Sequence, residues 1–340
     1  MSPLTFLEGV RRSLIHLEDD RVLRRAVVEQ LRRSVPFDAF AWLLTDPETT
    51  VGAAPLADVP CLDRLSRLVA LRYTSGRRWT EGPPGVPHRP VRPGSELEQF
   101  IATYGTYDVV SIAFADRFGW WGFLDAWREG GEFSDQDCEL LALLDRPVTT
   151  ALRQSRAAAF HLDDPVHRDD RGVRATPMGQ AVLLLGPELT VRHQTPQAES
   201  DLRALLPTEE SRRPVPAAAY NVAAQLLALE AGIDSHRPLA RTAIAPGHWI
   251  SVQAARLGED IAVTLGPIEQ RERWGLFCRT HGLSDRETQV VVCLAEGDDT
   301  HALAARLHLS EHTVQDHLKA VFAKTTVNSR RELLARARGA

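Results

Sequence analysis

The chain has 340 residues, which is enough for two or three domains of ordinary size. Its composition, with 44% hydrophobic and 25% charged residues, is that of a globular protein, and its formal net charge of −5 argues against a generally basic nucleic-acid binder. Four cysteines without any CxxC spacing argue against a disulfide framework or a zinc cluster.

The sequence lacks the patterns typical of secretion or membrane insertion. Its first residues, MSPLTFLEGVRR, contain no apolar run of the kind found in signal peptides. The most apolar long stretch, residues 216–233, is interrupted by Asn221, Gln225 and Glu230. We therefore expect a cytoplasmic protein without a membrane span.

Residues 1–160 are predicted to form one α+β domain, because antiparallel strand patterns are framed by helical patterns at both ends. Ser134 and Asp137 are placed to cap the last helix. The stretch at 77–90 is too rich in proline for regular structure. The predicted elements are helices at about 4–17, 20–34, 61–73 and 134–158, and strands at 37–46, 107–114 and 119–127.

A second α+β domain is predicted at 178–267, after a charged, proline-containing linker at 161–177. Its pattern is two strands, two helices and a three-strand meander. By the order of their elements, the first domain resembles a GAF domain and the second resembles a PAS domain. The elements of the second domain are strands within 181–193 and at 239–244, 249–257 and 260–265, and helices at 196–205 and 216–231.

The aromatic residues Phe114, Trp120 and Trp121 of the first domain are candidates for lining a ligand pocket. Apolar residues on both faces of these strands equally describe a sheet that is covered on both sides. Apolar pockets and cores use the same residue types, so both alternatives stay open.

The C-terminal residues 282–340 predict four short helices in an all-α domain. Ser284 and Glu287 fit a capping box, and Gly297 suits the end of that first helix. Thr300 is expected to cap the second helix and Ser310 the third. Ser329 and Glu332 fit a further capping box before the last helix. A turn of three to four residues between the two central helices is typical of a helix-turn-helix.

The third helix of this set has two distinct faces. Val314, Leu318, Val321 and Phe322 form one apolar stripe, at i, i+4, i+7 and i+8. Gln315, Asp316 and Lys319 fall outside that stripe and carry groups able to pair with base edges. A helix of 14 residues is about 21 Å long, and its cylinder fits the major groove of DNA.

The run LSDRE…LAEG…ALAARLHLSEHTVQDHLKAVFAKTTVNSRREL resembles the LuxR/GerE-type DNA-binding domain. The resemblance implies that the third helix enters the major groove and that the fourth supports a dimer. It places base contacts at Gln315, Asp316 and Lys319. It also places Thr313 and Lys324 near the DNA backbone, and Thr300 and Arg330 complete the predicted DNA-binding residues.

The distribution of lysine narrows the class of sensor. Lys319 and Lys324 are the only lysines of the chain, so residues 1–318 contain none. A phosphoacceptor receiver needs an essential lysine and a P-loop needs the lysine of GK[ST], so both input types are excluded. We expect the GAF-like and PAS-like domains to bind a small-molecule effector or a partner, and the segment 268–281 to couple them to the helix-turn-helix.

The sequence therefore predicts a bacterial, sequence-specific transcription regulator of multidomain architecture, with two α+β sensory domains and a C-terminal helix-turn-helix. The expected partners are a pseudo-palindromic DNA operator, a second copy of the chain, an effector and RNA polymerase. No cofactor is required by the sequence. No catalytic constellation is found. The C-terminal domain has four histidines that lack the close spacing of a metal site: His301, His308, His312 and His317.

Two alternatives belong to other classes of protein. In the first, the helix-turn-helix docks on a protein, because Asp316 repels phosphate. In the second, the chain is a ligand-modulated enzyme such as a GAF-containing nucleotide hydrolase, which would need carboxylates or histidines around a metal. Salt-dependent DNA binding would dismiss the first alternative.

Overall fold

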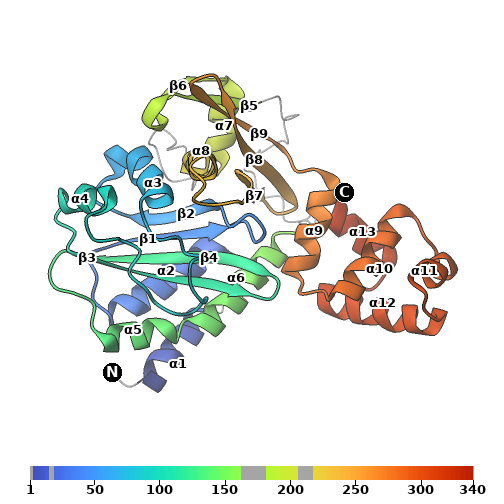
Figure 1. Cartoon of the computed structure of the whole chain (residues 1–340). Helices are drawn as coiled ribbons and strands as arrows, with labels where there is room; N and C mark the ends of the chain where they lie inside the picture. Colours follow the sequence, from blue (N-terminus) through green and yellow to red (C-terminus); the bar gives the residue numbers. More distant parts are fainter. Residues whose placement is uncertain (1–2, 15–18, 162–180, 206–216, 340) are drawn as a thin grey trace, which may run out of the picture.

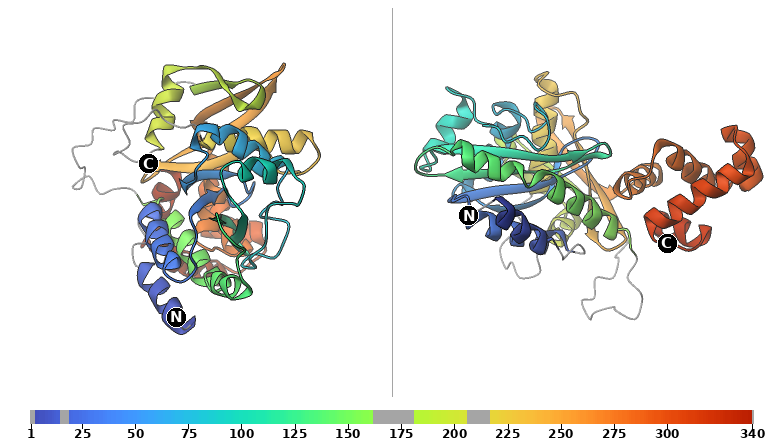
Figure 2. Two further views of the ribbon diagram at one scale, coloured as in Figure 1. Left: turned by 90° about the vertical axis from the view of Figure 1, so that its left-hand side faces the viewer. Right: turned by 90° about the horizontal axis from the view of Figure 1, so that it is seen from below.

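The computed structural model describes residues 3–14, 19–161, 181–205 and 217–339. It contains two antiparallel sheets with their helices, and a helical domain that projects from the side of this two-sheet body (Figures 1 and 2). The predicted fold class of two α+β regions followed by a helical region is confirmed. The predicted linker at 161–177 lies, except for its first residue, outside the described residues.

The first sheet has four antiparallel strands in the order β2-β1-β4-β3. β3 and β4 form a hairpin, and β1 pairs with β4 on one side and with β2 on the other. The bounds are β1 Ala39–Thr45, β2 Gly52–Asp58, β3 Asp108–Asp116 and β4 Gly119–Arg128, with α1 Pro3–Ser13, α2 Asp20–Arg32, α3 Leu65–Thr74, α4 Glu96–Ala102, α5 Asp135–Ala142 and α6 Asp145–Ala158.

One face of this sheet packs on α1, α2, α5 and α6 (Figure 1). Alternate strand residues point to that face, and among them Trp42 of β1 and Leu124 of β4 are fully buried. α2 contributes Leu23, Val27 and Leu31, which recur at helical spacing and give the helix one apolar side. The apolar side that the sequence pattern predicts for this helix therefore packs on the sheet.

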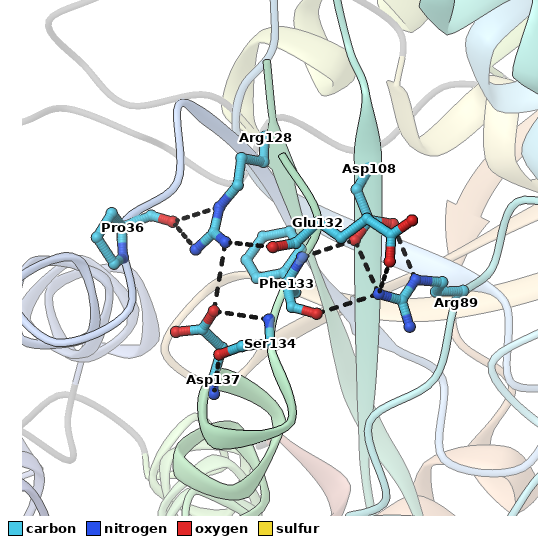
Figure 3. Close-up of polar contacts among 8 residues, drawn as sticks. All are labelled: Pro36, Arg89, Asp108, Arg128, Glu132, Phe133, Ser134 and Asp137. Atoms are coloured by element: carbon cyan, nitrogen blue, oxygen red, sulfur yellow. Dashed lines mark hydrogen bonds and ion pairs between the residues drawn. The ribbon is translucent and has the colours of Figure 1, made fainter. Parts of the chain in front are cut away.

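A network of polar contacts joins the ends of β3 and β4 to the start of α5 (Figure 3). Asp137 accepts hydrogen bonds from the Ser134 amide at 2.9 Å and from Arg128 at 3.3 Å. The Ser134 hydroxyl in turn accepts from the Asp137 amide, which completes a capping box. Arg89 pairs with Asp108 in the same network, with Nε and Oδ1 3.1 Å apart. The predicted cap at Ser134 and Asp137 is confirmed.

Three elements of this domain differ from the prediction. The helix expected at 134–158 is two helices, because Pro147 has no amide to donate to the Leu143 carbonyl. β2 was not predicted because it contains Pro55, which an edge strand tolerates. α4 was also not predicted. Its signal was the Ser95 cap, which accepts from the Glu98 amide, but the helix has only seven residues.

The second sheet has five antiparallel strands in the order β6-β5-β9-β8-β7. Its two strands, two helices and three-strand meander occur in the order expected of the PAS-like domain. The bounds are β5 Ala181–Leu185, β6 Val191–Gln194, β7 Leu239–Ala245, β8 His248–Leu257 and β9 Asp260–Pro267, with α7 Pro196–Ala204 and α8 Ala217–Glu230.

α8 lies between the two sheets and packs against both (Figure 1). It is apolar around most of its circumference, which is the pattern of a helix buried on all sides. Val222 is fully buried, and the polar Asn221 and Gln225 are buried with it. The two sheet domains thus share one hydrophobic core. No described helix is long and apolar enough to cross a membrane.

A buried ion pair reinforces the contact between the two sheets. Asp46, in the turn after β1, is bound by Arg241 of β7, with Nε to Oδ2 at 2.6 Å and Nη2 to Oδ1 at 2.7 Å. Both side chains are almost completely buried. A second pair, Arg78 with Asp234 at 2.8 Å, crosses the same boundary, and Arg78 also donates to Gln225.

The predicted coupling segment forms α9, Gln270–Thr280, and it contacts all three parts of the chain. Next to α9, Phe160, which follows α6, stacks on Trp249 of β8, with ring centroids 4.6 Å apart. The Phe277 ring of α9 meets Phe160 edge-on. Arg279 donates to the Phe118 carbonyl in the β3–β4 turn. α9 is therefore a packed junction between both sheets and the C-terminal helices.

Candidate nucleic-acid interface

The first helix of the C-terminal domain is capped as the sequence predicts. Ser284 accepts from the Glu287 amide at 3.3 Å, and the Glu287 carboxylate accepts from the Ser284 amide at 2.6 Å. Gly297 ends the helix in the left-handed region, at φ 101°, where glycine has no steric penalty. The four helices are α10 Asp285–Glu296, α11 Thr300–Leu307, α12 Glu311–Thr325 and α13 Arg330–Arg338.

The caps of the other helices are partly as predicted. Ser310 caps α12 and Ser329 caps α13. The cap of α11 is Asp299 and not Thr300, because the Asp299 carboxylate accepts the Ala302 amide at 2.8 Å. The prediction for Thr300 was therefore wrong as a cap, and this residue is the first of the helix.

A buried stripe fixes how α12 is rotated in the domain. Val314, Leu318 and Val321 are fully buried against the other helices, and Ala304 of α11 is buried where the two helices cross. Full burial of an aliphatic side chain stabilises by about 1.5–3 kcal/mol. The rotation of α12 is thus determined by its apolar side, and the opposite side faces outward.

The outward side of α12 carries the residues that the sequence assigns to base reading. Gln315, Asp316 and Lys319 are all exposed, and His312 precedes them on the same stripe. Lys319 Nζ lies 3.2 Å from Asp316 Oδ1, and His312 Nε2 lies 3.6 Å from the other carboxylate oxygen. Exposed pairs of this kind contribute about 0–1 kcal/mol, so another partner can replace them at little cost.

The first residues of α11, α12 and α13 lie together beside this stripe. Arg330 Nη2 donates to Thr300 Oγ1 at 2.6 Å, which joins the start of α13 to the start of α11. His301 Nδ1 lies 2.9 Å from the Glu311 carboxylate, which joins α11 to α12. Helix N-termini carry partial positive charge. Thr300 and Arg330 are therefore in contact, and Thr313 shares a hydrogen bond with the Ser310 hydroxyl at the start of α12.

Lys324 makes contacts inside the domain, and its predicted place near the DNA backbone stays a prediction. Its ammonium lies 2.6 and 2.9 Å from the two carboxylate oxygens of Glu287, and it also donates to the Gly282 carbonyl. The Glu287 side chain is buried, and although burial opposes its ionisation, the bonds from Lys324 and Ser284 hold the pKa of Glu287 below its ordinary value. Lys324 therefore closes the α10 capping box inside the domain.

Lys324→Met is expected to separate stability from DNA contact. The variant leaves the buried Glu287 carboxylate without its cation, so the free energy of unfolding should fall by about 1–3 kcal/mol. Thermal unfolding measures this loss. Binding to duplex DNA by the variant that is still folded should keep the same dependence on salt, because no phosphate contact is lost. If the DNA affinity of the variant depended less on salt while its stability was unchanged, Lys324 would instead contact the DNA backbone.

The three predicted pocket residues do not line one pocket. Phe114 and Trp121 are fully buried on the face that packs on α2 and α6, and Trp121 donates to Asp116 at 3.0 Å. Trp120 packs on the opposite face, beside the core that both sheets share. The alternation of side chains along β4 explains the separation. The burial of these residues favours the alternative of a sheet covered on both sides, and the ligand pocket stays a prediction.

The junction residues were not predicted as functional. Phe160, Trp249 and Phe277 come from three distant segments, and Arg273 of α9 donates to the Ala337 carbonyl at the end of α13 at 2.9 Å. The sequence pointed to this junction only through the predicted coupling segment at 268–281, which contains Arg273 and Phe277. Among the described residues, no group of three His, Cys, Asp or Glu side chains is arranged to hold a metal ion.

The C-terminal residues match a known family. The profile of bacterial regulatory proteins of the luxR family matches residues 281–337. This stretch is a LuxR-family domain. The predicted resemblance is confirmed, and the LuxR-type domain supports a transcription regulator with a sensory N-terminal part. No curated protein matches the chain at a significant level.

Solved structures with weak similarity span both parts of the chain. Escherichia coli SdiA is 12% identical with a TM-score of 0.36, and the match covers 99% of this chain and 98% of that chain. The chromophore-binding domain of the bacteriophytochrome RpBphP3 from R. palustris is 14% identical with a TM-score of 0.32. That match covers 46% of this chain and 61% of the bacteriophytochrome chain.

Proposed function

We propose that the chain is a sequence-specific DNA-binding transcription regulator whose two sheet domains control its LuxR-type domain. One observation carries this proposal. α12 is anchored by Val314, Leu318 and Val321, and this packing leaves Gln315, Asp316 and Lys319 exposed along the opposite side. A helix held in this way can enter the major groove and read bases.

The control by the sheet domains would pass through α9. This helix contacts the turn after β3, α6 and, through the pair of Glu272 with Arg237, the segment before β7, as well as α10 and α13. A small-molecule effector that changes the packing of either sheet domain would therefore act on the base of the LuxR-type domain. We infer that the protein works without enzymatic activity, in the cytoplasm, as a dimer on a pseudo-palindromic operator, with RNA polymerase as a further partner.

Lys319→Ala tests the assignment of the DNA-reading face. The variant should weaken binding to the protein's own site by about 1–3 kcal/mol, or roughly 5- to 150-fold, and relax the preference at one base position. The measurement is footprinting on the promoter region of its own gene, followed by titration with base-substituted duplexes. The matched control is Arg25→Ala, which removes an exposed arginine side chain of α2. An unchanged footprint and preference would remove Lys319 from the reading face.

Docking of the helix-turn-helix on a protein is the second candidate. It is favoured by the contact of Asp316 with Lys319 and His312, which offsets the positive charge that a DNA-binding face requires. The salt dependence of binding separates the two. Contacts to phosphate release counterions, so DNA binding must weaken steeply as salt rises.

A further inference from the structure

The fixed charges of the LuxR-type domain cancel at neutral pH. Residues 282–340 contain eight Lys and Arg and eight Asp and Glu, so their formal net charge is zero. The same residues hold four of the 12 histidines of the chain. Binding to phosphate depends on positive charge. The protonation of these histidines therefore decides whether the net charge of the domain is zero or positive.

Several fixed cations of the domain are offset by carboxylates. Arg306 of α11 is bound by Glu296 and by Asp298, with the latter contact at 3.0 Å. Lys319 is paired with Asp316. Lys324 and Arg336 are bound within the domain by Glu287 and Glu332. Protonation of histidine adds positive charge to this face near neutral pH, beyond that of Arg330.

Two histidines stand at the places where a backbone contact is expected. The His312 side chain is 85% exposed and lies in the α12 stripe ahead of Gln315. The His301 side chain is 86% exposed and follows Thr300 at the start of α11. In helix-turn-helix complexes the second helix lies in the major groove and the first crosses the backbone. Both imidazoles are therefore placed at the edge of the groove-facing side.

Each imidazole already lies beside a carboxylate. Glu311 of α12 and Asp299, the cap of α11, face His301, and the pair of Arg330 and Thr300 is next to it. The hydrogen bond from Glu311 raises the pKa of His301 above its ordinary value. Asp316 faces His312 and is shared with Lys319. A phosphate oxygen offers the same kind of acceptor, and such exposed rings can turn to it.

We propose that His301 and His312 are ligands of the DNA phosphate backbone and that they bind as imidazolium ions, so that the protein takes up protons as it binds DNA. This inference rests on the proposed DNA-binding function. Phosphate raises the pKa of a bound imidazole, so affinity is greatest below the pKa of the free histidine. The added affinity is lost as pH rises through the pKa of the bound histidine.

The size of the effect follows from two linked protonations. If DNA raises the pKa of each histidine by about one unit, each linked protonation changes the affinity by at most about 10-fold, so affinity should fall roughly 10- to 100-fold between pH 6 and pH 8. The probe is a duplex of about 30 base pairs of random sequence, because phosphate contacts are independent of sequence. Fluorescence anisotropy gives the affinity of the full chain, and calorimetry in buffers of different ionisation enthalpy gives the protons taken up.

The test variant is the double substitution His301→Gln with His312→Gln. Its affinity should change less than about 5-fold over the same pH range, and its proton uptake should be correspondingly smaller. The matched control replaces two exposed histidines of the second sheet domain, His193→Gln with His248→Gln, and should behave as the unchanged chain. Thermal unfolding checks that both variants are folded.

The outcomes separate this inference from the proposed function. A steep pH dependence that the double variant loses and the control keeps supports the inference. Salt-dependent DNA binding that is independent of pH, or that keeps its pH dependence in the double variant, overturns it and leaves the proposed function standing. An absence of salt-dependent duplex binding at every pH from 6 to 8 overturns both.

Discussion

Asp46→Ala is expected to lower the free energy of unfolding of the full chain by about 3–5 kcal/mol, because it leaves the buried Arg241 guanidinium without its principal counter-charge. The Asp46 carboxylate accepts from the Arg241 side chain twice, from the Arg241 amide and from the amides of Glu48 and Thr49. Urea unfolding followed by tryptophan fluorescence measures the loss.

Glu48→Gln is the matched control for this substitution. Glu48 binds the same guanidinium at 3.0 Å, but its side chain is 55% exposed, so its removal should cost less than about 1 kcal/mol. If both variants lost a comparable free energy of unfolding, burial would not explain the strength of the Asp46–Arg241 pair. A negligible loss in Asp46→Ala would contradict the view that the ion pair holds the two sheets together.

The same ion pair predicts how stability depends on pH. Burial opposes the ionisation of Asp46, but the hydrogen bonds and charge of Arg241 outweigh it and hold the pKa below its ordinary value. The contribution is therefore present above the unfolded-state pKa of about 4 and is lost as pH falls through the folded-state pKa. Asp46→Ala should lack this part of the acid-induced loss of stability.

Phe160→Ala is expected to cost about 3–5 kcal/mol and to loosen the junction between the sheets and the LuxR-type domain. Phe160 is fully buried, stacks on Trp249 and meets Phe277, and the Arg273 guanidinium lies 5.1 Å from its ring centroid. Its removal leaves a cavity between β8 and α9, at the end of α6. Amide hydrogen exchange should show loss of protection in α9 while β1 keeps its protection.

Phe114→Ala is the control for the junction variant. It removes an equally buried phenylalanine from the core of the first sheet domain, so it should cost a similar free energy. Its loss of protection should fall on the strands of the first sheet and spare α9. If Phe160→Ala left α9 as protected as in the unchanged chain, the junction would not depend on this aromatic contact.

Local signals made most of the fold predictable. The caps at Ser134, Ser284, Ser310 and Ser329 are set by side chains within three residues of the amides they bind, and the sequence contains both partners. Predictions failed where a tertiary position overrides a local rule. β2 tolerates proline because its place at the sheet edge leaves that residue without a required donor, and edge position depends on distant pairing.

The candidate site was predictable to the extent that helical periodicity determines it. The spacing of Val314, Leu318 and Val321 gives the buried side of α12, and the exposed side follows from it. The role of Lys324 was not predictable, because its partner Glu287 lies 37 residues earlier and meets it only in the packed domain. The shared core around α8 and the Asp46–Arg241 pair were missed for the same reason.

The dependence of DNA affinity on salt tests the central claim most directly. The full chain is titrated with a duplex from the promoter region of its own gene over a series of salt concentrations at pH 6.5. A DNA-reading α12 predicts that the logarithm of the association constant falls linearly with the logarithm of salt, with a slope of about −0.9 for each phosphate contacted. Binding that does not change with salt, or no binding at low salt, would contradict the account.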